Sequence, residues 1–220
     1  MNKTVSTGAY LQDDSLWLDI GEKIFLLRKD EIPVPGMHNV ENVLASALAG
    51  FAMNVSPESI CRAVRLFPGV EHRIEYVTRI NGVSFYNDSK ATNLDSLEKA
   101  LQSFTRPVRL IAGGRDKGDD YNRLNDLVKN KVKSLVVMGE AAPLILKAWQ
   151  KIVPAFEAEN FDEAVKKSFA SSEKGDVVLL SPACSSFDRF RDFEERGLVF
   201  KAAVKKFEKS MKMQMEAEQR

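Results

Sequence analysis

The residues best suited to chemistry lie in one short polar run, residues 87–93, which reads Asn-Asp-Ser-Lys-Ala-Thr-Asn. The run follows a strand-like stretch at residues 82–86 and precedes a helix-like stretch at residues 94–104. Ligands of open α/β sheets bind at such strand ends, because the first amides of the next helix converge there and attract anions. At such a site Asp88 can hold a ribose hydroxyl or a cation, and Lys90 can hold a phosphate or a carboxylate.

An ordinary strand-to-helix turn explains part of the same run. Thr92 or Asn93 can cap the following helix with a side-chain oxygen. A cap needs only one such side chain, whereas the run is polar at six of its seven positions. The pattern alone leaves both interpretations open.

Two further strand-like stretches end in polar loops. Residues 113–120, after the apolar stretch 108–112, form a loop with glycines at both ends and two cations, one of them Lys117. The spacing of the glycines and the lysine in this loop matches neither the dinucleotide-binding glycine pattern nor the Walker phosphate loop. Residues 181–188 follow a second apolar stretch, and their hydroxyls and free amides suit a carboxylate. Ser185 with Asp188 resembles a capping box and predicts a helix start there.

Two asparagines near the start of an amphipathic helix, Asn39 and Asn42, also need an explanation. Asparagine is a poor helix former, because its side chain competes for backbone hydrogen bonds. Capping explains Asn39, and amide recognition of a ligand such as a purine explains both residues. The sequence does not choose between them.

The run Gly69–Glu75 contains adjacent His72 and Arg73, which point to opposite faces of an extended chain. One of the two is therefore expected to be structural. Arg73 is the better functional candidate, because its guanidinium is always charged and binds phosphate oxygens in a forked geometry. Cys184 has no patterned histidine partner that would make it a nucleophile.

The order of elements predicts an α/β fold. Residues 1–35 contain short strands, and two helices follow before residue 69. From residue 76 onward strand and helix patterns alternate, which predicts a doubly wound, mostly parallel, Rossmann-like sheet. The expected strands are 108–112, 134–138, 155–158 and 176–180, and the expected helices are 123–130, 141–149, 161–171 and 186–196, the last ending at Gly197. A final helix from Leu198 is expected to dock on the sheet through an apolar stripe that includes Phe200 and Phe207.

Composition excludes several classes of protein. A chain of 220 residues with a net charge of +1 lacks the positive electrostatic field that would attract nucleic acid or an anionic membrane. Cys61 and Cys184 lie far apart without nearby metal-ligating partners, so neither a disulfide framework nor a zinc site is expected. No apolar run reaches the length of a membrane span, and residues 1–6 lack the apolar region of a signal peptide. We therefore expect a cytoplasmic protein without membrane insertion.

Taken together and in order, the motifs resemble those of the Mur ligase family from residue 36 onward. The motifs that carry the resemblance are residues 38–42, 69–75, 87–93, 113–120 and 180–188. The runs at 87–93 and 180–188 favour the members that add D-glutamate to UDP-N-acetylmuramoyl-L-alanine. The asparagine-rich helix and the His-Arg pair are also shared with folylpolyglutamate synthetase, so another ligase of this type is the alternative.

The resemblance implies an ATP-driven amide ligase that works through an acyl phosphate and uses magnesium. It places Asn39 and Asn42 against adenine, Arg73 at the phosphates and Asp88 at the ribose. It places Lys90 between substrate and phosphate as a catalytic residue, together with Arg73. The residues it assigns to D-glutamate are Thr92, Lys117, Ser186 and Phe187, with Phe193 nearby.

The chain also departs from the family pattern. It contains no glycine-rich phosphate loop ending in Lys-Thr or Lys-Ser and no uridine-binding domain, and the magnesium ligands are expected upstream, so no metal ligand is assigned here. Residues 1–70 are therefore expected to be the end of a truncated central ATPase domain, and residues 71–220 a complete amino-acid-binding domain. The expected partner is the missing N-terminal half of the enzyme. A stand-alone amino-acid-binding module and a partner-binding α/β domain are the alternatives.

Overall fold

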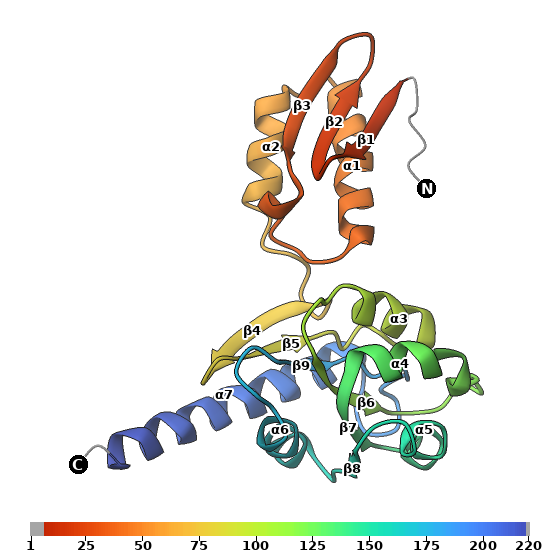
Figure 1. The fold of residues 1–220 in the computed structure, drawn as a ribbon, viewed down its shortest axis with the longest axis vertical. Coiled ribbons are helices and arrows are strands. Elements are labelled where there is room, and N and C mark those ends of the chain that lie inside the picture. Colours follow the sequence, from red (N-terminus) through yellow and green to blue (C-terminus); the bar gives the residue numbers. More distant parts are fainter. Residues whose placement is uncertain (1–6, 219–220) are drawn as a thin grey trace. The chain divides into compact units, whose positions relative to one another are not determined.

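The computed structural model describes residues 7–218, so residues 1–6, from which the absence of a signal peptide was inferred, lie outside it. The chain divides into two compact units, with the boundary between Gly69 and Val70. Each unit has its own sheet (Figure 1). The apolar clusters are likewise separate in the two units. Within residues 7–218 no helix is both long enough and apolar enough to cross a membrane.

The first unit packs two helices on a three-stranded antiparallel sheet. Its elements are β1 (Gly8–Gln12), β2 (Ser15–Asp19), β3 (Lys23–Arg28), the short 3-10 helix η1 (Lys29–Glu31), α1 (Met37–Ala52) and α2 (Pro57–Arg65). Leucines of β2 and β3 form a core with Val40 and Ala47 of α1 and with Ile60 of α2. Helix α2 begins as its sequence predicts, because the Ser56 side chain accepts a hydrogen bond from the Ser59 amide and Pro57 occupies the first turn.

The second unit contains a six-stranded sheet in the order β4-β5-β9-β6-β7-β8. The strands are β4 (Glu75–Ile80), β5 (Val83–Asn87), β6 (Val108–Gly113), β7 (Val132–Met138), β8 (Ala155–Glu157) and β9 (Val177–Leu180). Only β4 pairs antiparallel with its neighbour. The doubly wound, mostly parallel sheet expected from the sequence is therefore confirmed.

Helices cover both faces of this sheet (Figure 1). The helices are α3 (Leu94–Gln102), the 3-10 helix η2 (Tyr121–Leu124), α4 (Asn125–Lys131), α5 (Ala142–Trp149), α6 (Phe161–Ala170) and α7 (Phe193–Glu218). Helices α3, α4 and α5 share one apolar cluster with Leu110, while α6 and α7 share the other with Ile111. Adjacent residues of β6 thus point to opposite faces, as strand geometry requires.

The predicted helix over residues 186–196 is wrong for residues 186–192, whereas residues 193–196 are helical as expected. Residues 186–192 form turns, and α7 begins only at Phe193, where Asp192 Oδ1 accepts a hydrogen bond from the Glu195 amide at 2.7 Å. The expected capping box does not form. Ser185 Oγ donates instead to the Arg115 carbonyl, and Asp188 Oδ2 accepts from the Glu140 amide.

Gly197 does not end a helix, because α7 continues through it. A Cβ at this position would lie 2.2 Å from His72 Nδ1 and 3.1 Å from Asn87 Nδ2. The glycine is therefore explained by the close approach of α7 to the residues beside β4 and β5. The docking expected for the C-terminal helix is confirmed, since Phe200 is buried and Phe207 packs on the same cluster.

Candidate functional site

Three polar loops meet at the carboxyl edge of the large sheet, because β5, β9 and β6 are adjacent parallel strands. The loops are residues 88–93, 181–192 and 114–120. The Asp88 amide donates to the Leu180 carbonyl at 2.8 Å, and the Arg115 amide donates to the Ser185 carbonyl at 2.9 Å. Ser181 Oγ, in the loop after β9, also donates to Asp88 Oδ2, so this loop is hydrogen-bonded to both of its neighbours.

Arg196 of α7 forms hydrogen bonds with two of these loops, and it was not identified from the sequence as a residue of the site. The side chain is only 2% exposed. Its Nε donates to Ser89 Oγ at 2.9 Å, its Nη2 to the Ser89 carbonyl at 2.7 Å, and its Nη1 to the Cys184 carbonyl at 3.0 Å. Burial lowers the pKa of Arg196 to about 10, so the guanidinium remains charged at neutral pH. One feature of the sequence could have indicated that Arg196 is buried. It lies three residues after Phe193 and four before Phe200, on the apolar stripe of the helix.

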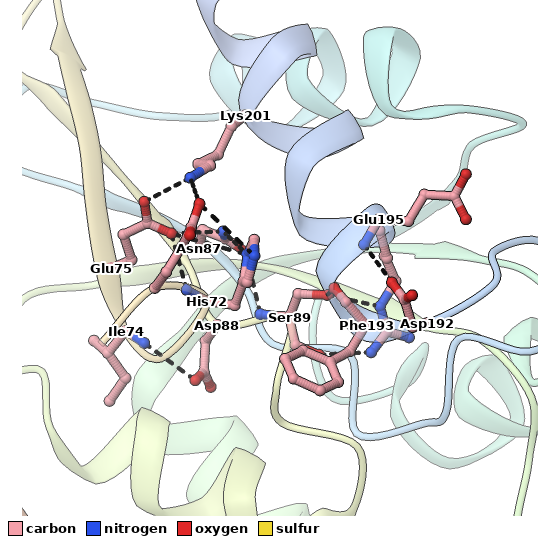
Figure 2. A network of polar contacts seen from close by, with 12 residues as sticks. His72, Ile74, Glu75, Asn87, Asp88, Ser89, Asp192, Phe193, Glu195 and Lys201 are labelled. Carbon is pink, nitrogen blue, oxygen red and sulfur yellow. Dashed lines mark hydrogen bonds and ion pairs between the residues drawn. The ribbon is translucent and has the colours of Figure 1, made fainter. Parts of the chain in front are cut away.

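Asp88 is buried and already hydrogen-bonded. Its Oδ1 accepts from the Ile74 amide at 3.2 Å (Figure 2). Its Oδ2 accepts from Ser181 Oγ at 2.8 Å. Burial raises the pKa of Asp88 to about 7, against the opposing effects of these hydrogen bonds and of the charges on Arg73 and Arg196. Each carboxylate oxygen can accept a second hydrogen bond, so both oxygens retain a lone pair for a further donor.

Lys90 and Phe193 form a pair beside Arg196. The Lys90 ammonium lies 4.3 Å from the centre of the Phe193 ring, a distance typical of a cation–π contact. Ser89 Oγ donates to the Phe193 carbonyl at 2.8 Å, which ties the start of α7 to the loop that carries Lys90. The two residues therefore lie together, although the sequence placed them more than a hundred positions apart.

The other residues expected at D-glutamate come from all three loops. Thr92 is half-buried and directly precedes Asn93, whose side chain caps α3 by accepting from the Ser96 amide at 2.9 Å. Lys117 is exposed in the loop after β6. Ser186 is buried, and its neighbour Phe187 is 61% exposed. The structure thus places these residues on loops that contact one another.

His72 has the structural role expected for one member of the His-Arg pair. It is buried with a left-handed backbone (φ 64°), and its Nδ1 lies 2.9 Å from Asn87 Nδ2. Asn87 also donates to Glu75, and Glu75 pairs with Lys201 of α7 (Figure 2). Arg73 is exposed, and its amide donates to the Val70 carbonyl.

Asn39 and Asn42 belong to the first unit, whereas the other candidates belong to the second. The N-cap of α1 is Gly36, so Asn39 is not the capping residue. Its Nδ2 instead donates to the Pro35 carbonyl at 2.6 Å, one turn back, while Asn42 is exposed.

The described residues fit only part of an ATP–magnesium complex. Within the second unit, Arg73 is exposed and Asp88 retains lone pairs for a hydroxyl. Within the first unit, Asn42 is exposed. A triphosphate also needs a cradle of backbone amides, a lysine and the metal's own ligands. The carboxylates of Glu71 and Glu75 lie close to His72, but both are ion-paired with Lys201. Residues 7–218 therefore do not fit the phosphate end of the nucleotide.

The fold and its loops agree with comparisons with known proteins. The chain belongs to the Mur ligase family, because the family described as Mur ligase, glutamate ligase domain, matches residues 72–184. The resemblance drawn from the motifs is thereby confirmed.

Among individual relatives, the UDP-N-acetylmuramoylalanine–D-glutamate ligase of Bacillus mycoides (strain KBAB4) is 45% identical over 206 residues, which cover 93% of this chain and 45% of the relative. The enzyme of the same name from Bacillus anthracis (strain A0248) is 46% identical over the same shares. The chain thus spans slightly less than half the length of the curated relatives it matches.

Solved structures show the same fold. UDP-N-acetylmuramate-alanine ligase MurC from Thermotoga maritima superposes with a TM-score of 0.61 at 16% identity, over 92% of this chain and 45% of that one. Folylpolyglutamate synthase from Mycobacterium tuberculosis, solved with ADP and AMPPCP, gives a TM-score of 0.59 at 14% identity, over 87% of this chain and 46% of that one. At these identities the likeness is one of fold.

Proposed function

We propose that this chain is the amino-acid-binding part of an ATP-dependent, cytoplasmic ligase that joins D-glutamate to UDP-N-acetylmuramoyl-L-alanine in peptidoglycan precursor synthesis. The observation that carries the proposal is the meeting of three polar loops at the sheet edge, where the loop after β9 is hydrogen-bonded to each of the other two. The residues expected at D-glutamate belong to these loops. The 45% identity to D-glutamate ligases over 93% of the chain supports the same substrate.

In this proposal Lys117 and the hydroxyls of Thr92 and Ser186 hold the two carboxylates of D-glutamate. Charge-assisted hydrogen bonds from an ammonium and from hydroxyls are the contacts a dicarboxylate favours. Phe187 and Phe193 border the amino acid, and Lys90 lies between it and the phosphate. The loops contribute mainly by positioning the amine that attacks the activated carboxylate.

Asn39, Asn42, Arg73 and Asp88 are proposed to contact the nucleotide. The phosphate cradle and the magnesium ligands are proposed to come from an N-terminal half, the expected partner of this chain. In the same scheme residues 1–70 complete the central ATPase domain and residues 71–220 form the amino-acid-binding domain. ATP then supplies the energy that activates the muramoyl carboxylate.

An NMR titration of the chain tests the amino-acid site. We expect amide shifts around Thr92, Lys117 and Ser186 with millimolar D-glutamate, and smaller shifts with L-glutamate, because directed polar contacts penalise misplaced groups. Lys117→Ala should abolish most of the shifts. The matched control is Lys133→Ala, since Lys133 is exposed at the amino end of β7. A folded wild-type chain without shifts at these loops would contradict the proposal.

A phosphate-release assay with ATP, magnesium, D-glutamate and UDP-N-acetylmuramoyl-L-alanine tests whether catalysis needs both this chain and an N-terminal half. We expect no turnover from the chain alone and turnover when the N-terminal half of a relative is added. In that assembly Lys117→Ala should raise KM for D-glutamate more than it lowers kcat, as loss of a ground-state contact does. D-glutamate binding without turnover in the assembly would instead indicate a stand-alone binding module.

A further inference from the structure

The turn that presents Lys117 is held by the carboxylate of the residue before it. Asp116 Oδ2 accepts a hydrogen bond from the Gly118 amide at 2.9 Å, and Asp116 Oδ1 accepts one from the Tyr121 hydroxyl at 2.7 Å. One carboxylate oxygen of Asp116 therefore holds the backbone just after Lys117, and the other joins the turn to the Tyr121 side chain. The Lys117 side chain itself is exposed, so its position depends on this turn.

Tyr121 anchors the turn to the core. Its side chain is only 5% exposed, and Trp149 packs edge-to-face against its ring at a centroid distance of 5.8 Å. Trp149 Nε1 also donates to the Tyr121 carbonyl at 3.2 Å. These contacts leave the tyrosine little freedom, so its hydroxyl is a fixed point for Asp116.

The same hydroxyl reaches the loop after β9. It lies 3.2 Å from Cys184 Sγ, and Cys184 stands two residues before Ser186. Burial raises the pKa of the Cys184 thiol to about 11 and raises the pKa of Tyr121 as well, so both groups are protonated at neutral pH. The thiol can therefore donate to the phenol oxygen while the phenol donates to Asp116. One buried hydroxyl thus joins the loop of Lys117 to the loop of Ser186.

We propose that Tyr121 and Asp116 are positioning residues that set the distance between Lys117 and Ser186, and thereby select glutamate over the amino acid one methylene shorter, aspartate. The inference rests on the proposed function, since it concerns the same D-glutamate site. A rigid spacing between two carboxylate-binding groups favours one chain length, whereas a mobile lysine adapts to either. One methylene changes binding by about tenfold or more when the site cannot adjust.

Tyr121→Phe tests this inference in the intact chain, because it removes one hydroxyl and keeps the ring, the charge of Asp116 and the packing against Trp149. NMR titrations give the Kd for D-glutamate and for D-aspartate, and hydrogen exchange reports the Gly118 amide. We expect the Kd for D-glutamate to rise about tenfold, the cost of one hydrogen bond to a charged group. The Kd for D-aspartate should change less than twofold, so the preference for D-glutamate over D-aspartate becomes smaller. Hydrogen exchange of the Gly118 amide should become faster.

The matched control is Tyr86→Phe. Tyr86 packs between Tyr76 and Phe104, and its hydroxyl has no hydrogen bond in the described part of the chain. This variant should keep the wild-type preference and the wild-type exchange at Gly118. Asp116→Asn, which keeps an acceptor for one of the two contacts, should recover part of the preference that Asp116→Ala loses.

The outcomes separate this inference from the proposed function. A wild-type chain that binds neither amino acid would overturn both. Wild-type binding of D-glutamate, together with an unchanged preference in Tyr121→Phe, would overturn the positioning role alone. Equal losses of affinity for both amino acids would also overturn it, because a general structural defect gives that result.

Discussion

Gly197→Ala is expected to destabilise the second unit, although the same change usually stabilises a helix. Replacing glycine by alanine inside a helix contributes about 1 kcal/mol of stability through backbone entropy. At Gly197 the new Cβ would lie 2.2 Å from His72 Nδ1 and 2.8 Å from His72 Cε1. These distances are about 0.7–1.8 Å shorter than a normal van der Waals contact of about 3.5–4.0 Å, so either α7 or the His72 ring must move.

His72 has little room to move away. It is buried, its backbone is left-handed, its ring is bonded to Asn87, and its carbonyl accepts from the Lys90 amide at 3.0 Å. Overpacking of a well-packed site costs about 1–3 kcal/mol, and loss of the His72–Asn87 hydrogen bond costs about 1 kcal/mol more. After subtracting the helix gain, we expect a net loss of roughly 1–3 kcal/mol.

The control is Gly50→Ala in α1, where a Cβ would meet Ile60 at an ordinary 3.6 Å. This change should stabilise the first unit by about 0.5–1 kcal/mol. The chain has two tryptophans, Trp17 in the first unit and Trp149 in the second. Urea unfolding followed by fluorescence therefore reports the second unit in a Trp17→Phe background and the first unit in a Trp149→Phe background.

Adding His72→Ala to Gly197→Ala supplies a second check. If the clash with the ring is the cause, the double variant should lose less stability than the two single losses added together, because contacting residues are not additive. A Gly197→Ala variant as stable as wild type, or more stable, would refute the explanation given for this glycine.

Further predictions concern four buried residues. Arg196→Met should lower the free energy of unfolding by about 2–4 kcal/mol and weaken the NMR shifts caused by D-glutamate, because it leaves the Ser89 and Cys184 carbonyls unpaired. Arg196→Lys should restore neither the stability nor the shifts. A urea unfolding curve of Arg196→Met equal to that of the wild type would show that Arg196 does not hold the two loops together. The folded pKa of Asp88, about 7, exceeds its ordinary value of 3.8, so its neutral form stabilises the fold fully below pH 3.8 and this stabilisation is lost as the pH rises through 7. The free energy of unfolding of the wild type, measured relative to that of Asp88→Asn, should therefore fall between pH 5 and pH 8 by up to about 1.4 kcal/mol per pH unit. If urea unfolding gives the same difference between the two proteins at every pH, the raised pKa is contradicted. Cys61 and Cys184 are buried with raised thiol pKa values, so neither should be alkylated at pH 8 until urea unfolds the chain, and rapid modification of the native protein would exclude the burial described.

Much of the fold follows from the sequence, because strands and helices have different apolar periods and caps are local signals. Apolar stretches predicted β6, β7 and β9, and the expectation that Thr92 or Asn93 caps the next helix is met by Asn93 at the start of α3. The three polar loops were found because each directly follows an apolar strand. That they gather at one edge was inferred from the parallel sheet, whose strand order the sequence did not contain.

The errors and omissions have a common physical cause. Ser185 and Asp188 look like a helix start, but the structure uses them to bond Arg115 and Glu140, which come from other loops. Gly197 looks like a helix end, but it is small because His72, 125 positions earlier, packs against it.

Arg196 looks like a solvated charge, yet it lies buried among the carbonyls of two loops. The sequence by itself determined the elements, their polarity and the residue types offered at each strand end. Tertiary packing decided which of those residues are bonded to one another and which remain available to a ligand, because these contacts join residues that are distant along the chain.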